Sequence, residues 1–495
     1  MNTKPKKAVI VGAGLGGLAT ALRLAHRGWA VTVCEQADSP GGKMNRWETN
    51  GYRFDTGPSL ITMPWVFEEL FESVGTRLCD HVQLLSVHPM ADYVFDDGTR
   101  FTHTNHLPDW LKTVRTLENG DASGFLRFMA LGARLFEISK PTFFGRSPFE
   151  PPDPAHLKLL PRIPVFSGWG NYHATLRRFI HSPHLLQMFD RYMTYVGSSP
   201  YRAPATLFVI PFIEMAYGGW HVKGGLYEII MALVRMAQAR GAEVRTRTRV
   251  TALHRQADRV SGVELESGET LEADVVVLNG DAARTPSLLG EKDAKLPPES
   301  ERSLSGLVFL FALRSALADR PHHSVFFSAD YAAEFRQLFD ERRFPDDPTV
   351  YVNLPSRTDR SLAPGSGEVM FVMANAPATD ADPWDAAQIA TARQRVMARL
   401  KKGGFPDIEE DIVDSDVWTP RRLADRYGMP GGSIYGCVSH GWRRSFLRPP
   451  NRDRTLPGLY RVGGSSHPGG GTPTVLMSAA ITTRLIEKYE NHQNC

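Results

Sequence analysis

The hydrophobic and polar positions of the first 35 residues form a short apolar run, then a helical pattern, then a second apolar run. Residues 7–12 read KAVIVG, which is typical of a strand buried on both faces of a parallel sheet. Apolar residues then recur at helical spacing from Leu18 to Ala25, and Gly28 ends the predicted helix. A second apolar run, AVTVCE, ends on Glu35. The pattern therefore predicts a strand–helix–strand unit.

A GxGxxG motif joins the first strand to the helix, at Gly12, Gly14 and Gly17. The first glycine permits a tight turn, the second lets a phosphate approach the backbone, and the third lets helix and strand pack closely. The helix N-terminus then offers free N–H groups to a pyrophosphate, and Glu35 can accept hydrogen bonds from a ribose. The unit predicts a bound dinucleotide and disfavours NADP, but it leaves NAD and FAD open.

Two further glycine-rich segments favour the longer cofactor, FAD. Gly41 and Gly42 precede the basic Lys43, which suits a cofactor clamped along its length. Residues 463–471 are mostly Gly, Ser and Pro, and a helix capped by Thr472 is predicted to follow. A helix N-terminus aimed at a flavin ring would stabilise the negative charge that develops on reduction.

The rest of the chain predicts a mixture of strands and helices. Residues 303–313 and 368–376 are apolar runs typical of strands, and residues 385–402 form a helical pattern. A hairpin is predicted to turn on Ser267 and Gly268. The fold class predicted is α/β.

Composition and charge exclude several function classes. The chain has 495 residues and a net charge of only +3, which argues against a nucleic-acid partner. The cysteines are scattered, so neither a disulfide framework nor a metal site is expected, and a cytoplasmic location is favoured. No apolar run approaches the roughly 18–20 residues that span a bilayer, so any membrane contact is expected to be peripheral.

Several blocks resemble one family. VIVGAGLGGLATALRLAHRG, EQADSPGGK, FDTGPSLIT, YVGSSPYRAPATL, GGWHVKGGLYEII and LYRVGGSSHPGGGTPTVL occur in the order found in carotenoid desaturases of the phytoene desaturase type. These enzymes fall within the wider flavin amine oxidase-like group. The resemblance implies FAD, peripheral attachment to the inner membrane and oxidation of a long isoprenoid polyene, with oxygen or a quinone as electron acceptor.

The resemblance also implies a domain division and a set of cofactor-binding residues. A Rossmann-like FAD domain with a mixed sheet, discontinuous in sequence, is expected from residues 1–75, 218–300 and 416–495. An α+β substrate domain that associates with the membrane is expected from residues 76–217 and 301–415. The residues expected to bind FAD are Gly12, Ala13, Gly14, Gly16, Gly17, Glu35, Gln36, Gly42, Lys43, Gly57, Pro58, Ser59, Val250, Gly464, Thr472, Thr474 and Val475.

The chain departs from the family pattern in ways that leave the substrate open. Thr472 and Thr474 flank Pro473, where the family usually has an apolar residue and a glycine. The GSSPYRAPAT block looks more like members that act on already desaturated or hydroxylated carotenoids. A relative that oxidises a terminal methyl group to an aldehyde also fits.

The stretch from Leu135 to Trp169 is rich in proline and aromatic residues and carries Lys140, Arg146, Lys158 and Arg162. Such a mixture suits an interface with anionic lipid head groups, and an ordered loop over a helical domain is the alternative. A water-insoluble polyene would need a surface that contacts lipid in order to enter the protein, which favours the interface.

Desaturation is expected to proceed by hydride transfer to the flavin and loss of a proton to a base. Glu214, the one acid in an apolar run, and His467, in the C-terminal glycine cluster, are the candidate bases. A structural, hydrogen-bonded histidine is the favoured interpretation of His467. Alternatives are an amine oxidase, a polyene isomerase that uses reduced flavin, and a protein that carries an isoprenoid without chemistry.

Overall fold

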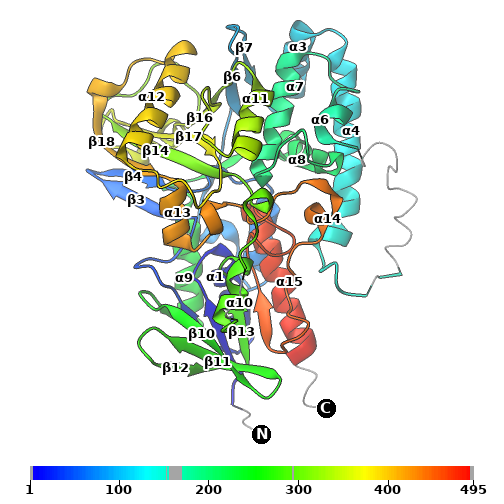
Figure 1. Ribbon diagram of the computed structural model, residues 1–495, viewed down its shortest axis with the longest axis vertical. Helices are drawn as coiled ribbons and strands as arrows, with labels where there is room; N and C mark the ends of the chain where they lie inside the picture. Colours follow the sequence, from blue (N-terminus) through cyan, green and yellow to red (C-terminus); the bar gives the residue numbers. More distant parts are fainter. Residues whose placement is uncertain (1–3, 152, 155–169, 292–294, 491–495) are drawn as a thin grey trace.

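The computed structural model describes residues 4–151, 153–154, 170–291 and 295–490. Two large sheets organise the chain, and in Figure 1 the seven-stranded sheet lies above the five-stranded sheet. Both ends of the chain lie at the bottom of that view, beside the smaller sheet. The predicted α/β class is confirmed.

The five-stranded sheet is parallel throughout and has the order β19-β13-β1-β2-β9. Its core is the predicted unit of β1, α1 and β2, so the interpretation of the first 35 residues is confirmed. The other strands come from distant parts of the chain. The bounds are β1 Lys7–Val11, α1 Leu15–His26, β2 Ala30–Cys34, β9 Glu243–Arg245, β13 Val275–Leu278 and β19 Leu459–Arg461.

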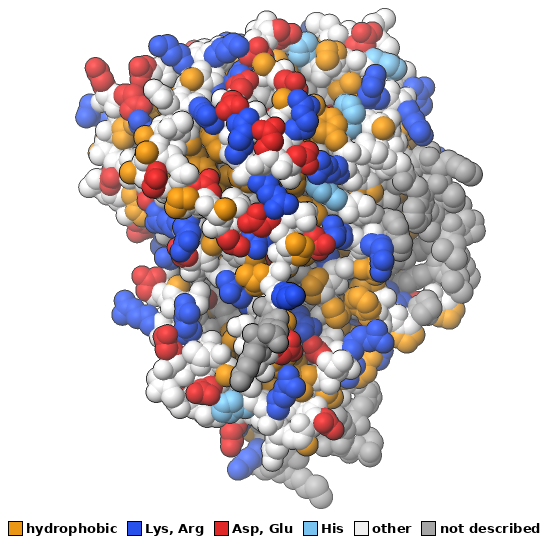
Figure 2. Space-filling view, viewed as in Figure 1, with side chains coloured by type: hydrophobic (Ala, Val, Ile, Leu, Met, Phe, Trp, Pro, Cys, Tyr) orange, Lys and Arg blue, Asp and Glu red, His pale blue; other side chains and the backbone are white. Residues whose placement is uncertain are grey.

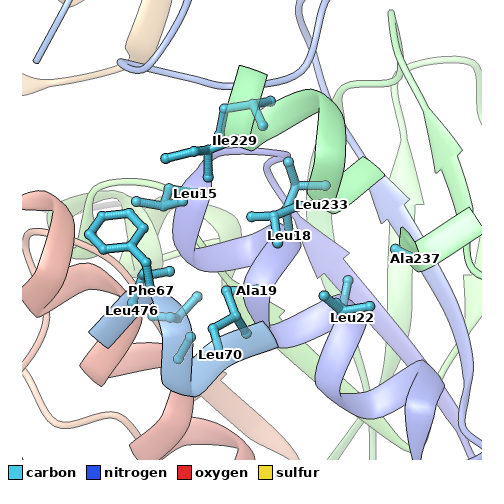
Figure 3. Packing of buried hydrophobic residues seen from close by; sticks show 14 of the residues in the cluster. Leu15, Leu18, Ala19, Leu22, Phe67, Leu70, Ile229, Leu233, Ala237 and Leu476 are labelled. Atoms are coloured by element: carbon cyan, nitrogen blue, oxygen red, sulfur yellow. The ribbon is translucent and has the colours of Figure 1, made fainter. Parts of the chain in front are cut away.

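Three helices cover α1 and form the core of this part of the molecule: α2 (Pro64–Glu72), α9 (Tyr227–Gln238) and α15 (Thr472–Glu490). Figure 3 shows Leu15 and Leu18 of α1 between side chains of the neighbouring helices. All these side chains are almost completely buried. Burial of this apolar surface holds the N-termini of α1 and α15 on the same side of the sheet.

The seven-stranded sheet has the order β18-β14-β17-β16-β15-β6-β7 and is antiparallel except for the β6–β15 pair. A mixed sheet was expected for the cofactor domain. The five-stranded sheet that contains β1 is instead parallel throughout, and the mixed sheet is the seven-stranded one. The predicted strands at 303–313 and 368–376 are confirmed as β14 and β17. The bounds are β6 Ala91–Val94, β7 Arg100–His103, β14 Ser305–Leu313, β15 His323–Phe326, β16 Val350–Asn353, β17 Glu368–Ala376 and β18 Ile412–Trp418.

Helices lie beside this sheet and complete the upper half of the molecule in Figure 1. The predicted helix at 385–402 is confirmed as α12, with Asp385 as its N-cap. The bounds of these helices are α3 Leu107–Leu117, α4 Asp121–Ser139, α6 Tyr172–Leu176, α7 Pro183–Asp190, α8 Val209–Tyr217, α11 Tyr331–Arg336, α12 Ala386–Lys402, α13 Pro420–Tyr427 and α14 Gly441–Phe446. The short helix α10, Thr285–Leu288, lies in the lower half of the view.

The predicted hairpin is confirmed as β11–β12, part of a three-stranded sheet with β10. Gly268 lies in its turn with φ +86°, a conformation that glycine adopts without strain. The remaining strands form two small pairs. The bounds are β3 Arg46–Thr49, β4 Tyr52–Asp55, β5 Leu84–Ser86, β8 Trp220–Val222, β10 Val250–Gln256, β11 Arg259–Leu265 and β12 Thr270–Glu272.

The surface is mixed in charge, since Figure 2 shows basic and acidic side chains interspersed over the face viewed. Among the described residues, no helix is both long and apolar enough to cross a membrane. Residues 152 and 155–169 of the stretch expected to be an interface, which include Lys158, Arg162 and Trp169, lie outside the described residues. Phe149, within the described part, is 40% exposed.

Candidate functional site

The first glycine loop, Gly12 to Gly17, has little room for side chains at its glycine positions. Gly12 has φ +102°, which disfavours any side chain at this position. A Cβ on Gly14 would lie 2.9 Å from Nδ2 of Asn279, and a Cβ on Gly17 would lie 2.2 Å from the carbonyl oxygen of Gly12. The α1 N-cap, Gly14, makes no side-chain capping bond, so the first N–H groups of the helix have no side-chain acceptor there.

Glu35 lies at the end of β2, beside this loop, and is only 7% exposed. Its two carboxylate oxygens accept hydrogen bonds from the backbone N–H groups of Ala13 (2.8 Å) and Ala37 (2.9 Å). The carboxylate therefore ties the glycine loop to the end of β2 and keeps further lone pairs for a ribose. The next residue, Gln36, donates from Nε2 to the carbonyl of Arg426 at 3.0 Å.

The second glycine loop lies directly against the first. Gly41 donates its N–H to the carbonyl of Ala13 at 2.8 Å, and a Cβ on Gly42 would lie 3.3 Å from Cα of Gly14. Lys43 follows and points inward, where its Nζ donates to the carbonyl of Ile434 at 2.5 Å. Burial lowers the pKa of Lys43, and the nearby carboxylate of Asp281 opposes that shift.

The C-terminal glycine cluster meets the same place from the other side. A Cβ on Gly16 would lie 3.1 Å from side-chain carbons of both Val462 and Val475. At Gly464, a Cβ would lie 3.9 Å from Nζ of Lys43. The first turn of α15 is closed by the N–H of Val475, which donates to the carbonyl of Gly471 at 2.9 Å. The structure thus brings three glycine segments, far apart in sequence, to one site.

The start of α15 borders a cavity of about 760 Å³. One part of its wall is the C-terminal segment from Pro468 to Thr474, together with Gly57, Pro58 and Ser59. The other part is mainly apolar and comes from α4, η2 (Lys140–Phe144) and α8. This part includes Leu135, Ile138, Phe143, Phe144, Val209, Ile210 and Ile213. The cavity thus extends from the predicted flavin end into an apolar space.

Glu214 of α8 lines this cavity, as a candidate base should. Its residue is 3% exposed, and its Oε1 accepts a hydrogen bond from the hydroxyl of Tyr192 at 2.7 Å. Its Oε2 is buried and has no hydrogen-bond partner among the described residues. Burial raises the pKa of Glu214, because the charged form is poorly solvated there.

His467, the other candidate base, is not among the residues that line the cavity. Its Nε2 donates to the carbonyls of Phe143 (2.8 Å) and Arg146 (2.9 Å). Burial lowers the pKa of His467 to about 4, so the ring is neutral at pH 7. These bonds join the C-terminal cluster to η2 and the turn that follows it, which is the geometry of a structural histidine.

Val250 and the threonines of α15 occupy different surroundings. Val250 begins β10 and pairs with Leu265, and it does not line the cavity. Thr472 and Thr474 do line it, and the hydroxyl of Thr474 donates to the carbonyl of Gly471 at 2.9 Å. These two threonines are therefore placed to contact a ligand at the start of α15.

Several residues at the site were missed from the sequence. Asn279 donates from Nδ2 to the carbonyl of Gly12 at 3.1 Å, and its position at the end of a buried parallel strand was a usable signal. Arg191 and Tyr195, one helical turn apart, and Tyr351 of β16 also line the cavity. No spacing in the sequence joins Tyr351 to the other two.

The residues at this site fit a dinucleotide. The loop after β1 approaches its neighbours too closely for side chains, two glycine segments face it, and the basic Lys43 lies between them. An anionic pyrophosphate would meet backbone N–H groups and a positive helix end there. No group of three or more His, Cys, Asp or Glu that could hold a metal ion occurs among the described residues.

Comparison with known sequences gives a match over nearly the whole chain. The profile of the family described as "Flavin containing amine oxidoreductase" matches residues 15–486. The chain is 34% identical to the 4,4'-diapolycopene oxygenase of a Methylomonas species, covering 98% of this chain and 99% of that protein. It is also 34% identical to the zeta-carotene-forming phytoene desaturase of Myxococcus xanthus, with coverages of 99% and 96%. Identity to the 1-hydroxycarotenoid 3,4-desaturase of a Flavobacterium species is 34%, with coverages of 97% and 99%.

Solved structures share the fold at lower identity. An oxidoreductase from Methanosarcina mazei superposes with a TM-score of 0.66 at 17% identity, covering 97% of this chain and 100% of that one. Putrescine oxidase bound to putrescine gives a TM-score of 0.64 at 14% identity, with 99% of each chain covered. These two likenesses establish a common architecture.

Proposed function

The chain belongs to the flavin-containing amine oxidoreductase family, and we propose that it is a desaturase of a long isoprenoid polyene, a carotenoid or an apocarotenoid. It is a FAD-dependent oxidoreductase of the carotenoid desaturase type. The observation that carries the proposal is the similarity, over nearly the full length, to enzymes named for carotenoid desaturation and oxygenation. The largely apolar cavity beside the predicted flavin end supports a polyene substrate.

We assign the cofactor to the three glycine segments. The pyrophosphate would lie against the N-terminus of α1 at Gly12–Gly17, and the carboxylate of Glu35 would hold a ribose. Lys43 would balance the cofactor's negative charge from inside the site. The start of α15, at Thr472–Val475, would face the flavin ring, where its positive end stabilises the reduced form. Val250 would contact the adenine from the separate β10 strand.

When bound, FAD supplies an acceptor for the hydride that leaves one carbon of the substrate. The neighbouring carbon must then lose a proton, so that two hydrogens leave and one double bond forms. Glu214 is the side chain proposed to take that proton, because none of the residues that the structure describes hydrogen-bonds its Oε2 and the residue lines the cavity. The apolar walls keep water away from the cationic carbon that precedes proton loss.

Delivery of the substrate is proposed to take place at a membrane surface. Phe143 and Phe144 of η2 line the cavity and belong to the aromatic and basic stretch, Leu135 to Trp169, that is predicted to meet lipid. A cavity wall next to such a stretch would let a polyene pass from the bilayer without entering water. Oxygen or a quinone would then reoxidise the flavin.

A second candidate is oxidation of a terminal group to an aldehyde. The oxygenase from Methylomonas is as similar to this chain as the desaturases are, so the fold accommodates that outcome. An amine substrate fits poorly, because the cationic Arg191 lines the cavity and would repel an ammonium group. Isomerisation would give a new product of unchanged mass, whereas transport without chemistry would give no product.

Two measurements test the proposal. The purified protein, reconstituted with FAD, should show the flavin absorption bands, and their absence would remove the cofactor assignment. The holoenzyme is then incubated in liposomes with phytoene, neurosporene, a hydroxylated carotene and shorter analogues. A product lighter by two hydrogens supports desaturation, and an added oxygen supports the second candidate. A new product of unchanged mass supports isomerisation, and recovery of the substrate alone supports transport without chemistry.

A further inference from the structure

The cavity contains a group of polar side chains that flavin binding and proton removal leave mostly unused. We call it the polar cluster and define it as Tyr93, Arg191, Tyr195, Glu214, His323 and Tyr351, all of which line the cavity. Its members come from β6, α8, β15, β16 and the 3₁₀ helix η4 (Arg191–Val196). Five separate elements thus direct polar side chains into one largely apolar space.

Arg191 is the centre of the polar cluster. Its guanidinium lies over the rings of Tyr195 (5.4 Å) and Tyr351 (5.3 Å), and its Nη1 donates to the hydroxyl of Tyr195 at 3.3 Å. No Asp or Glu oxygen lies within ion-pair distance of it in the part of the chain that the structure describes. A guanidinium has five N–H donors, so Arg191 keeps donors for a ligand.

Other polar atoms of the cavity wall also lack partners. Among the described residues, Oε2 of Glu214, Nε2 of His323, the hydroxyl of Tyr331 and Oγ1 of Thr206 are buried without a hydrogen bond. All four side chains line the cavity. Each unsatisfied buried group costs about 1–3 kcal/mol, so a polar ligand group that bonded to any of the four would remove part of that cost.

The polar cluster reaches the predicted flavin end of the cavity. The hydroxyl of Tyr351 is hydrogen-bonded both to Nδ1 of His323 (2.8 Å) and to Oγ of Ser59 (2.7 Å). Ser59 follows Gly57, whose backbone is so close to Lys43 that a Cβ would lie 1.8 Å from the lysine carbonyl. A ligand group held by the polar cluster would therefore lie on the side of the cavity where the cofactor is expected.

We propose that Arg191 and Glu214 form a subsite for a hydroxyl or carbonyl oxygen at the end of the polyene. The inference rests on the proposed function and narrows its substrate class to isoprenoids that already carry oxygen at one end. Arg191 donates to that oxygen, Glu214 and the tyrosine hydroxyls complete its hydrogen bonds, and the apolar wall from α4 and α8 holds the hydrocarbon. The oxygen-bearing end then lies nearest the reacting carbons.

The test compares the binding of polyenes of equal length that end in a methyl group, a hydroxyl or an aldehyde. Each is delivered to the holoenzyme in detergent micelles, and quenching of the protein's intrinsic fluorescence gives the dissociation constant. We expect at least one oxygenated polyene to bind about tenfold more tightly than the hydrocarbon, since one good charge-assisted hydrogen bond contributes about that factor. The preferred partner identifies the oxygen group.

Arg191→Met should remove this preference and leave the affinity for the hydrocarbon unchanged. Arg191→Lys, which keeps the charge but loses the planar donors, should remove only part of it. Arg178→Met changes an exposed arginine that does not line the cavity and serves as the matched control. If Arg191→Met fails to retain FAD, the preference of the wild-type protein and the effect of Arg191→Lys decide the question.

Two results would overturn the inference. Equal affinity of the wild-type holoenzyme for all three polyenes would show that the polar cluster does not select oxygen, while the proposed polyene function would stand. The same conclusion follows if Arg191→Met weakens all three ligands alike. Failure of the holoenzyme to bind any polyene would instead reject the proposed function, and the subsite with it.

Discussion

The two ends of the candidate site are built in different ways. At the cofactor end, the contacts are made by the main chain, where glycines at 12, 14 and 17 leave the backbone bare beside Glu35 and Lys43. At the far end, the wall consists of side chains, with Arg191 and Glu214 among tyrosines. The first end suits a cofactor of fixed shape, whereas the second end can change with the substrate.

This difference predicts which substitutions affect which property. A change in the glycine loops should impair retention of FAD whatever the substrate is. A change in the polar cluster should leave FAD bound and alter stability, pH dependence or ligand choice. The comparison fails if a variant of the polar cluster loses FAD as readily as a variant of the glycine loop.

The largest effect is expected for Gly17→Ala. Its new Cβ would lie 2.2 Å from the carbonyl oxygen of Gly12, a backbone atom that can move only with its strand. The overlap should destabilise the protein by about 3 kcal/mol and prevent retention of FAD. Flavin absorbance per protein and the thermal unfolding midpoint measure the two effects.

Gly120→Ala is the matched control, because a Cβ on Gly120 would meet nothing within 4 Å. Gly120 has φ −70°, so alanine fits its backbone without strain. If Gly17→Ala binds FAD as well as Gly120→Ala does, the close packing of the first loop is not required for the cofactor.

An intermediate effect is expected for Glu35→Gln. Both carboxylate oxygens accept backbone hydrogen bonds, and an amide NH₂ would face the N–H of either Ala13 or Ala37. Loss of one bond and of the ribose acceptor should weaken FAD binding about 30-fold, which is about 2 kcal/mol. Titration of the apoprotein with FAD gives the dissociation constant.

Glu243→Gln, an isosteric change on the neighbouring strand β9, should leave that dissociation constant unchanged. Its side chain is 54% exposed and pairs with Arg245. Equal FAD affinities in the two variants would contradict the role proposed for Glu35.

The smallest effect is expected for Glu214→Gln, at the other end of the site. The folded state holds a proton on Glu214 at pH values where the unfolded state, with a pKa near 4.5, has released it. The free energy of unfolding should therefore fall as pH rises from about 4.5 through the raised pKa, and the glutamine variant should lack this fall.

Denaturant unfolding between pH 4 and 8 measures this difference between wild type and variant. Burial also raises the pKa of Asp55 to about 6 and that of Glu334 to about 7, but both groups contribute equally to the two proteins. Parallel pH profiles would mean that folding does not change the pKa of Glu214. Loss of FAD in the variant would contradict the difference proposed between the two ends of the site.

The cofactor end was predictable from the sequence because its information is local. Each glycine segment adjoins a strand or helix with a clear period, so periodicity and glycine spacing alone locate Gly12–Gly17 and the start of α15. The family blocks then join these segments into one site. The domain boundaries expected from the resemblance stay a prediction.

The far end was not predictable, because no short stretch contains it. Arg191 and Glu214 lie 23 positions apart on different elements, and Tyr351 comes from strand β16 of the seven-stranded sheet. Only packing decides which tyrosines face the cavity, and periodicity does not reveal it. Glu214 was found as the one acid in an apolar run, but its neighbours were not.

The outer strand β19 pairs in parallel with β13, and about 180 residues of chain separate the two partners. A growing chain released from the ribosome in order cannot close this edge until β19 and α15 have been made. Folding must therefore pair β13 with a strand that is made much later, which is intrinsically slow. Until then, the outer edge of β13 stays unpaired. If FAD binds only the protein whose five-stranded sheet is complete, its binding would stabilise the native state of the newly made chain.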